Sequence, residues 1–338
     1  MPNSALSTAL SALILGAAAL TLSACAPADA HEHGQDTHTH GPDTHTHDMA
    51  DTAGTLPTLD DIAEPKLSVT PLRPNMDALI GPGGNIAVLY GEDGALLVDD
   101  KFADNADEIL ARVGARSGAR PVFVLNTHYH GDHTGSNAEM KAAGAVVVAH
   151  HGARELMASE IENRLFGRTV EAREPAAFPD MTFRSDMTID FATDAGGDRV
   201  DLIHVPAAHT SGDLIVHFRA ADVLHLGDNF FNGMFPYVDI DAGGSLQGMI
   251  DAQKTALDLA GADTVVVPGH GPITDRDGLA GSIALLEDIR DRMQARLDAG
   301  ADLDTVLAAD IYDDLGMDDG FINQERIARI AFRSLSQE

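Results

Sequence analysis

Short runs of apolar residues, rich in β-branched types, recur along most of the chain and predict buried strands. The first two runs, 85–90 and 95–98, flank Gly91-Glu-Asp-Gly94, a composition that favours a hairpin turn. The further runs lie at 122–126, 145–149, 181–183, 187–191, 200–205, 214–218, 223–226 and 262–267. The folded part is therefore expected to begin near Lys66 and to be built largely on β-sheets.

Apolar residues at helical spacing predict helices between and after these strands. In residues 103–113, Ala106, Ile109, Leu110 and Val113 fall on one face. Further helices are predicted at 136–143, from 152 toward the irregular stretch around 175–180, at 279–299 and at 324–335. This order of elements indicates an α+β fold in which two sheets pack face to face with helices outside.

A cluster of histidines follows the strand that ends at Asn126. Alternate residues of an extended chain face the same way, so His128 and His130 can bind one ion together. Gly131 allows a turn, after which Asp132 and His133 point toward a second ion. Imidazole nitrogens and carboxylate oxygens are zinc ligands, and a catalytic zinc keeps one position open for water.

Three later residues of the same types also follow predicted strands. His209 lies between two strands, while Asp228 and His270 each come directly after one. A rigid sheet can aim side chains at such positions. Other histidines lie within or at the ends of strands, and we expect them to be packed or surface residues rather than ligands. They are His150, His151, His204, His217 and His225.

Taken together, His128-Tyr-His-Gly-Asp-His133, Ala-Ala-His209-Thr-Ser-Gly-Asp, Leu-Gly-Asp228-Asn and Pro-Gly-His270-Gly resemble the signature of the metallo-β-lactamase superfamily. The resemblance runs from about Ile80 to the C-terminus and implies the four-layer αβ/βα sandwich of that family. It also implies seven ligands for two zinc ions per chain. His128, His130 and His209 would bind the first ion, Asp132, His133 and His270 the second, and Asp228 would bridge them.

Two zinc ions about 3.5–4 Å apart can hold a hydroxide at neutral pH and polarise a carbonyl. The expected activity is hydrolysis of a small molecule with an electrophilic carbonyl: a lactone, ester, thioester or lactam. Asp132 would orient the hydroxide and could protonate the leaving group. An apolar stretch after Asp228 could line the substrate site or pack in the core. Its members are Phe230, Phe231, Met234, Phe235 and Tyr237.

The same stretch, Phe230 to Asp239, resembles a periplasmic branch of the family found beside quinoprotein and sulfur-oxidation enzymes. Three alternative functions remain open: a β-lactamase proper, a mononuclear iron enzyme of the sulfur dioxygenase type, and a non-enzymatic zinc-binding lipoprotein. The iron enzyme would take His, His and Asp from the same framework. The lipoprotein is suggested by the histidine-rich N-terminal tract.

Charge restricts the choice of substrate. The chain has 22 Lys and Arg against 53 Asp and Glu, a net charge of −31, and shows no cluster of cations. Binding to a nucleic-acid backbone needs such a cluster, so nucleic acid is not expected as a partner. Residues 220–253 contain neither Lys nor Arg, whereas β-lactamase relatives carry a lysine there for the drug carboxylate. Neutral lactones or aryl esters are therefore expected to be better substrates than anionic β-lactams.

The N-terminal residues predict export. Residues 5–24 are mostly small and apolar and end in Leu22-Ser-Ala-Cys25, which resembles a bacterial lipobox. Residues 1–25 are thus interpreted as a signal peptide with Cys25 as the lipidation site, and Ala26 suggests the outer membrane. Residues 26–65, with six histidines between 31 and 47, are expected to be a disordered tether. The folded domain would span 66–338, periplasmic and bound to the membrane only through its lipid.

Overall fold

Two β-sheets form the centre of the fold. The computed structural model describes residues 55–194, 196–317 and 320–336. The first sheet has, in spatial order, β1 (Ser68–Arg73), β2 (Met76–Ile80), β3 (Ile86–Gly91), β4 (Gly94–Val98), β5 (Pro121–Asn126), β6 (Val146–His150) and β9 (Met181–Phe183). Neighbours from β1 to β4 are antiparallel, whereas β4, β5, β6 and β9 run parallel. The carboxyl ends of these last four strands therefore meet at one edge.

The second sheet is mainly antiparallel. Its order is β10 (Met187–Phe191), β11 (Asp198–Val205), β12 (Asp213–Phe218), β13 (Val223–His225) and β14 (Val265–Val267). Only the pair of β13 and β14 is parallel. These two strands consequently end side by side, which places the residues that follow them, Asp228 and His270, close together.

Both faces of the first sheet are buried at β4, in its middle. Leu96 and Val98 pack between the sheets, while Ala95 and Leu97 face helices on the other side. A strand covered on both faces is apolar at every position, which is why the sequence shows continuous runs here.

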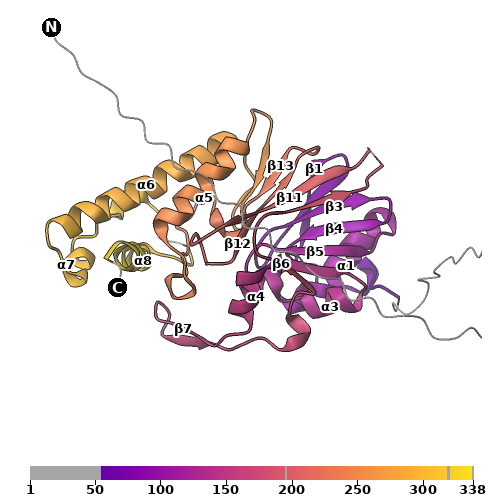
Figure 1. Ribbon diagram of the computed structural model, residues 1–338, viewed down its shortest axis with the longest axis horizontal. Helices are drawn as coiled ribbons and strands as arrows, with labels where there is room; N and C mark the ends of the chain where they lie inside the picture. The colour runs from indigo at the N-terminus through magenta and orange to yellow at the C-terminus, as the bar shows by residue number, and fades with distance from the viewer. Residues whose placement is uncertain (1–54, 195, 318–319, 337–338) are drawn as a thin grey trace, which may run out of the picture. The chain divides into compact units, whose positions relative to one another are not determined.

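The helices cover the outer faces of the two sheets. α1 (Ala106–Ser117) and α3 (Asn137–Ala142) contribute Ile109, Val113 and Met140 to the core outside the first sheet. α5 (Leu246–Leu259) and α6 (Arg276–Asp298) cover the second sheet. Figure 1 shows these two helical layers on opposite sides of the strands. The predicted αβ/βα sandwich is confirmed.

A second apolar core joins the C-terminal helices to the segment after Asp228. α7 (Leu303–Ala308) and α8 (Gln324–Ser336) pack with α5 and α6, and Ile327 and Ile330 of α8 are buried there. Phe235 and Val238 belong to the same cluster. The C-terminal helices therefore support the loop on which part of the site is built.

Several elements differ from the sequence prediction. The hairpin of β1 and β2 and helix α5 were not predicted. The helix predicted from residue 152 is only α4 (His151–Met157); the chain then forms a second hairpin, β7 (Ile161–Asn163) and β8 (Arg168–Val170). This hairpin is short and largely polar, so no apolar run announces it. Short 3-10 helices complete the fold: Leu59–Asp61, Ala103–Asn105, Pro175–Ala177, Gly227–Asn229, Ile240–Ala242 and Asp313–Leu315.

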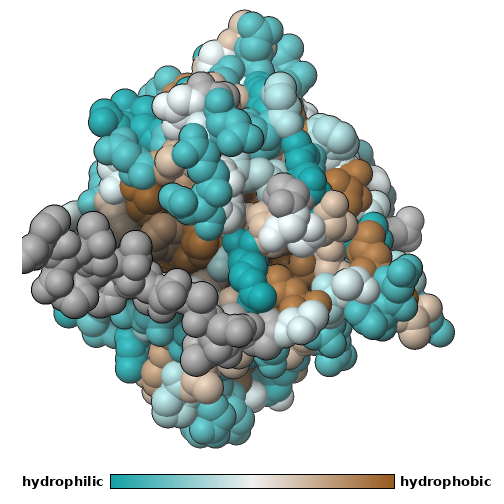
Figure 2. All heavy atoms as spheres, turned by 90° about the vertical axis from the view of Figure 1, so that its right-hand side faces the viewer, coloured by the Kyte–Doolittle hydropathy of each residue, from teal (hydrophilic) through white to brown (hydrophobic). Residues whose placement is uncertain are grey.

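The predicted signal peptide, the lipidation site Cys25 and residues 26–54 of the predicted tether lie outside the described residues. The last part of that tether, 55–65, is placed against the domain. Leu56 packs against the core outside the first sheet, and the Thr58 hydroxyl donates to Asp61 at 2.7 Å. The folded part thus begins before Lys66. Among the described residues, no helix is both long and apolar enough to cross a membrane. On the face in Figure 2, hydrophobic residues lie in separate groups among hydrophilic ones.

Candidate metal centre

The histidine cluster lies where β5 ends, at the edge shared by the parallel strands. His128 lies in a bend after β5, His130 has an extended backbone, and α2 (Gly131–Thr134) begins immediately afterward. This short helix turns Asp132 and His133 toward the same space. The Asp99 carboxylate, at the end of β4, accepts hydrogen bonds from the Thr127 backbone N–H (2.7 Å) and hydroxyl (2.8 Å), which fixes the start of the loop.

The structure brings the seven predicted ligands together as two groups. The first group is His128, His130 and His209, where His130 Nδ1 lies 3.1 Å from His128 Nε2 and 2.9 Å from His209 Nε2. The second group is Asp132, His133 and His270. His270 Nε2 lies 3.2 Å from Asp132 Oδ2 and 3.4 Å from His133 Nε2.

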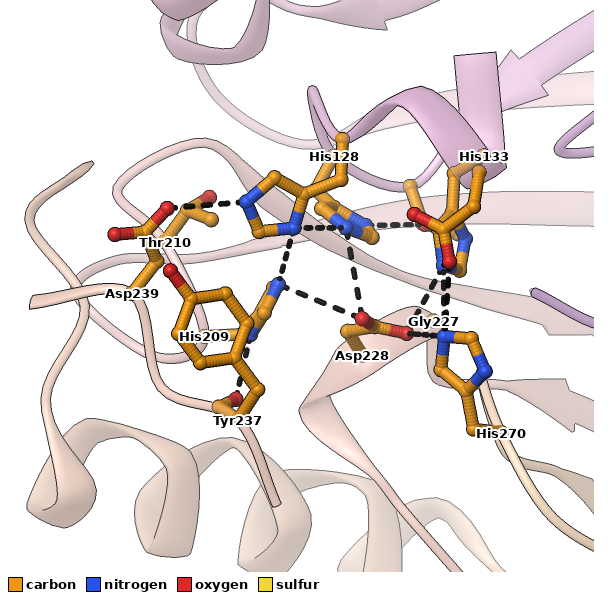
Figure 3. A network of polar contacts seen from close by, with 12 residues as sticks. His128, His133, His209, Thr210, Gly227, Asp228, Tyr237, Asp239 and His270 are labelled. Carbon is orange, nitrogen blue, oxygen red and sulfur yellow. Dashed lines mark hydrogen bonds and ion pairs between the residues drawn. The ribbon is translucent and has the colours of Figure 1, made fainter. Parts of the chain in front are cut away.

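Asp228 lies between the two groups and divides its oxygens between them. Oδ2 is 3.8 Å from His128 Nε2 and 3.5 Å from His209 Nε2. Oδ1 is 3.0 Å from His133 Nε2 and 3.3 Å from His270 Nε2. Figure 3 shows the labelled imidazoles converging on this carboxylate. One carboxylate is thus placed to serve two cations.

Groups behind the histidines determine which ring nitrogen carries the proton. His209 Nδ1 donates to the carbonyl oxygen of Tyr237 at 2.8 Å, and His130 Nε2 donates to Asp239 at 3.0 Å. Because the Thr127 hydroxyl donates to Asp99, its oxygen can only accept from His128 Nδ1, at 3.0 Å. In each neutral ring the opposite nitrogen is left with a lone pair. Three lone pairs of the first group therefore face one another.

The pKa values of the two groups shift in opposite directions. Burial lowers the pKa of His128 well below its usual range and that of His209 to about 4. Burial also disfavours the charged forms of His133 and His270, but nearby carboxylates outweigh it. Asp228 above all raises the pKa of His133, and it raises that of His270 to about 9. His128 and His209 are therefore uncharged, whereas His133 and His270 attract cations, including protons.

This arrangement fits a pair of metal ions. In a tetrahedral zinc site with Zn–N distances near 2.0 Å, neighbouring ligand atoms are about 3.3 Å apart. The 2.9 and 3.1 Å separations in the first group are close to that spacing. Lone pairs so close repel unless a cation lies between them. Moreover, Asp228 Oδ1 is buried without a satisfactory hydrogen bond.

Two glycines allow the chain to approach the ligands closely. A Cβ on Gly84 would lie 2.1 Å from the His133 ring, and one on Gly269 would lie 2.1 Å from Asp228 Oδ1. Backbone packed this tightly limits the rotamers of His133 and Asp228, and so it holds the second group in place.

A pocket of about 930 Å³ opens onto the ligand groups. Of the predicted apolar wall, Phe231, Met234, Phe235 and Tyr237 line it. Phe230 does not: it is fully buried in the core beneath the second sheet. Its assignment to the substrate site is therefore corrected to a packing role.

A sequence model of the metallo-β-lactamase superfamily matches residues 80–270, a stretch that contains all seven residues. The chain belongs to this superfamily. Solved structures agree on the fold. A metallo-β-lactamase from Pontibacter korlensis superimposes with a TM-score of 0.56 over 66% of this chain and all of that one, at 20% identity. A double mutant of a sec-alkyl sulfatase gives a TM-score of 0.61 over 79% of this chain and 50% of that one, at 16% identity.

Relatives in sequence include hydroxyacylglutathione hydrolases. The protein of Gloeobacter violaceus is 30% identical over 41% of this chain and 45% of its own length. That of Methylococcus capsulatus is 32% identical over 42% and 44%. A probable metallo-hydrolase of Bacillus subtilis is 27% identical over 47% and 72%. The matched stretch thus spans less than half the length of the two hydroxyacylglutathione hydrolases.

The pocket of this superfamily member also contains residues that the sequence did not single out. Phe102, Phe166 and Phe321 add aromatic surface, and Arg168 and Arg173 add positive charge. The arginines come from the β7–β8 hairpin and the segment after it, outside the cation-free stretch 220–253. The prediction that neutral substrates are preferred was drawn from that stretch alone and did not include these two arginines. The two arginines reach the pocket because segments distant in the sequence pack together, and no local sequence pattern indicates this.

The other histidines that the structure describes lie apart from the two groups. His225 is buried, and its Nε2 lies 3.0 Å from the carbonyl oxygen of Asn85. His150 is buried as well and stacks on His204, with ring centroids 3.6 Å apart. His151 Nε2 lies 2.7 Å from Arg184 and 3.2 Å from Glu155, and His217 is half-buried in β12. None of the four contacts named here involves a predicted ligand.

Proposed function

We propose that this protein is a two-zinc hydrolase that cleaves small molecules at an electrophilic carbonyl. The observation that carries the proposal is the Asp228 carboxylate, whose two oxygens face two separate ligand groups. Among the possible substrates, a thioester is supported by the relatives named hydroxyacylglutathione hydrolases. Because those matches cover less than half of the relatives, the activity is carried to this chain only as a proposal.

The side chains of this chain would divide the work. His128, His130 and His209 would hold one ion, and His133, His270 and Asp132 the other. When bound, the two ions would supply a nucleophile from water at neutral pH and polarise the carbonyl. Although burial opposes ionisation, His133 above all keeps the pKa of Asp132 low. Asp132 therefore orients water as an acceptor, and any proton it gives a leaving group must first come from that water.

The presence of a full second set of ligands favours two zinc ions over one iron. A mononuclear iron enzyme of the sulfur dioxygenase type needs two histidines and one carboxylate. With only one ion present, Asp132, His133 and His270 would have no role although their ligand atoms lie within 4.8 Å of one another. A β-lactamase proper shares the proposed chemistry and differs only in substrate.

The proposal is tested by counting metal and assaying substrates together. The six histidines between 31 and 47 would bind zinc in any buffer, so the count is made in a full-length variant with alanine at those positions. We expect two zinc equivalents and hydrolysis of at least one of a matched lactone, aryl ester, thioester and β-lactam. One iron equivalent, or no tight metal, would contradict the proposal.

We also propose that the chain is exported and carries lipid on Cys25. The support is the sequence Leu22-Ser-Ala-Cys25 after an apolar segment. Cys25→Ser should release the protein from the outer-membrane fraction or leave the precursor uncleaved, as seen by fractionation and intact mass. Wild-type protein found without lipid in the cytoplasm would refute this proposal. Ser23→Gly, which keeps a small residue, serves as the control.

A further inference from the structure

Arg173 projects into the pocket beside the ligand loop. It follows β8, and its backbone N–H donates to the carbonyl oxygen of Met157 at 2.7 Å, which fixes this part of the chain. Its side chain is half-buried and lines the pocket together with Tyr129, His130 and Asp132. A cation is thus held next to the proposed reacting centre.

The guanidinium lies directly over Gly131. A Cβ built on Gly131 would come within 2.6 Å of Arg173 Nη2 and 3.3 Å of Nη1. Gly131 begins α2 and has no need of a left-handed backbone conformation. Its missing side chain therefore serves this contact, because any larger residue would displace the guanidinium from the ligand loop.

Within the part of the chain that the structure describes, the Arg173 guanidinium makes no hydrogen bond or ion pair. Other arginines show how readily partners are found in this acidic protein: Arg164 and Arg333 share Asp241, and Arg219 pairs with Asp201. Glu171 and Glu174 line the same pocket but do not pair with Arg173. A half-buried guanidinium that faces a pocket and pairs with none of the carboxylates lining it leaves its donors available to a ligand.

Another part of the pocket is aromatic. The rings of Phe166 and Phe321 are 5.0 Å apart, and those of Phe166 and Tyr237 are 5.5 Å apart. Arg168 lies over the Phe166 ring at 5.6 Å, so its charge is turned toward that ring. The pocket therefore offers three surfaces: an aromatic wall, the ligand groups and the free fork of Arg173.

We infer that Arg173 binds a carboxylate of the substrate. The planar guanidinium matches a carboxylate in a two-bond geometry that an ammonium cannot reproduce. The substrate class is then a carbonyl compound with an aryl or acyl arm for the aromatic wall and a carboxylate arm for Arg173. This inference rests on the proposed function, in which the reacting carbonyl lies at the ligand groups between the two arms.

The experiment measures binding, so that it does not depend on turnover. Zinc-loaded full-length protein is titrated with 4-phenylbutyrate and with its uncharged isostere 4-phenylbutyramide by calorimetry. Zinc attracts the carboxylate in every variant, and comparison between variants therefore isolates Arg173. We expect Arg173→Gln to weaken phenylbutyrate binding about tenfold and to leave phenylbutyramide binding unchanged. Arg173→Lys should recover part of the loss.

Two further variants guard the interpretation. Gly131→Ala should reproduce the loss of carboxylate preference while Arg173 is still present, provided that zinc content is unchanged. Arg296→Gln, on the exposed side of α6, removes the same charge away from the pocket and should change neither affinity. Equal weakening of both ligands by Arg173→Gln, or weakening of neither, would overturn the inference. Thioester hydrolysis in the same samples reports separately on the proposed function.

Discussion

The two ligand groups differ in how firmly the protein holds them. In the first group, His128 and His209 are fully buried, and all three rings have an acceptor behind them. In the second group, among the residues that the structure describes, only the His133 ring has such a partner, Asp99 at 2.7 Å from its Nδ1. The side chains of Asp132 and His270 are 23% and 26% exposed at the pocket.

The two groups also differ in what can satisfy them. Burial keeps His128 and His209 uncharged, so their lone pairs remain opposed until a metal cation arrives. His133 and His270 face carboxylates that raise their pKa, so protons can satisfy the second group in the absence of metal. The comparison teaches that the first site is built to require a metal, whereas protons compete with metal at the second.

The largest expected effect comes from removing what the groups share. Asp228→Ala deletes the carboxylate that faces both, so both zinc equivalents should be lost from the purified protein. Metal-dependent hydrolysis should fall about 10³-fold, which corresponds to about 4 kcal/mol of transition-state stabilisation. Zinc analysis and kcat/KM measure the two outcomes. Retention of two equivalents would show that Asp228 is not the bridge.

Mutation of a single ligand should affect the two groups differently. His270→Ala is expected to remove only the second ion, leaving one equivalent and a rate reduced about 10²-fold. His209→Ala should instead disturb the buried first group and, through it, lower the melting temperature of the loaded protein. Zinc counts and thermal unfolding on the two variants make the comparison. If His270→Ala lost both ions, the groups would not be separable in this way.

Much of this site could be predicted from the sequence because each ligand follows a strand and local spacing reveals it. His128 and His130 are two residues apart, and the order of the other ligands repeats a family pattern. The roles of Asp239 and Arg173 could not be predicted in this way. Asp239 contacts His130 and Arg173 lies against Gly131, and in each case the two residues are distant in the sequence. Phe230 and Phe231 are neighbours in one loop, and only packing decides which faces the pocket.

The same limit applies to the fold. Strands buried on both faces, such as β4 to β6, were evident as apolar runs. The hairpin of β7 and β8 was not, because its burial alternates between buried and exposed positions and only Ile161 and Asn163 are buried in it. Helix α5 was not predicted, and its buried face includes the polar residue Gln253 among apolar ones.

A matched pair of carboxylates behind the ligands tests each group in turn. Asp239 supports His130 of the first group, and Asp99 supports His133 of the second. Asp239→Asn and Asp99→Asn keep size and an acceptor oxygen but remove the charge, and each should weaken one ion by about 10–100-fold. Asparagine also tolerates the left-handed backbone of Asp99, φ 65°. Stepwise chelator titration should show a different ion weakened in each variant.

The exposed Asp190 on β10, paired with Arg199, provides the control for this pair. Asp190→Asn removes the same charge far from any ligand and should leave both affinities unchanged. If Asp239→Asn and Asp99→Asn weakened the same ion, the assignment of one supporting carboxylate to each group would be wrong.

The last expected effect is the pH dependence of the two affinities. A proton must leave His270 before that nitrogen can bind zinc, and its pKa is raised to about 9 by Asp228 against the effect of burial. Below that value, each unit of lower pH should weaken the second ion at least tenfold, because His133, whose pKa is also raised, must lose a proton as well. His209, with a pKa of about 4, carries no proton on Nε2 in the same range, so the first ion should hold its affinity. Competition with a chromophoric chelator between about pH 6 and 8 measures both affinities.

In His270→Ala the pH-dependent step should be absent. Parallel weakening of the two ions with falling pH would show that the groups do not differ in their competition with protons.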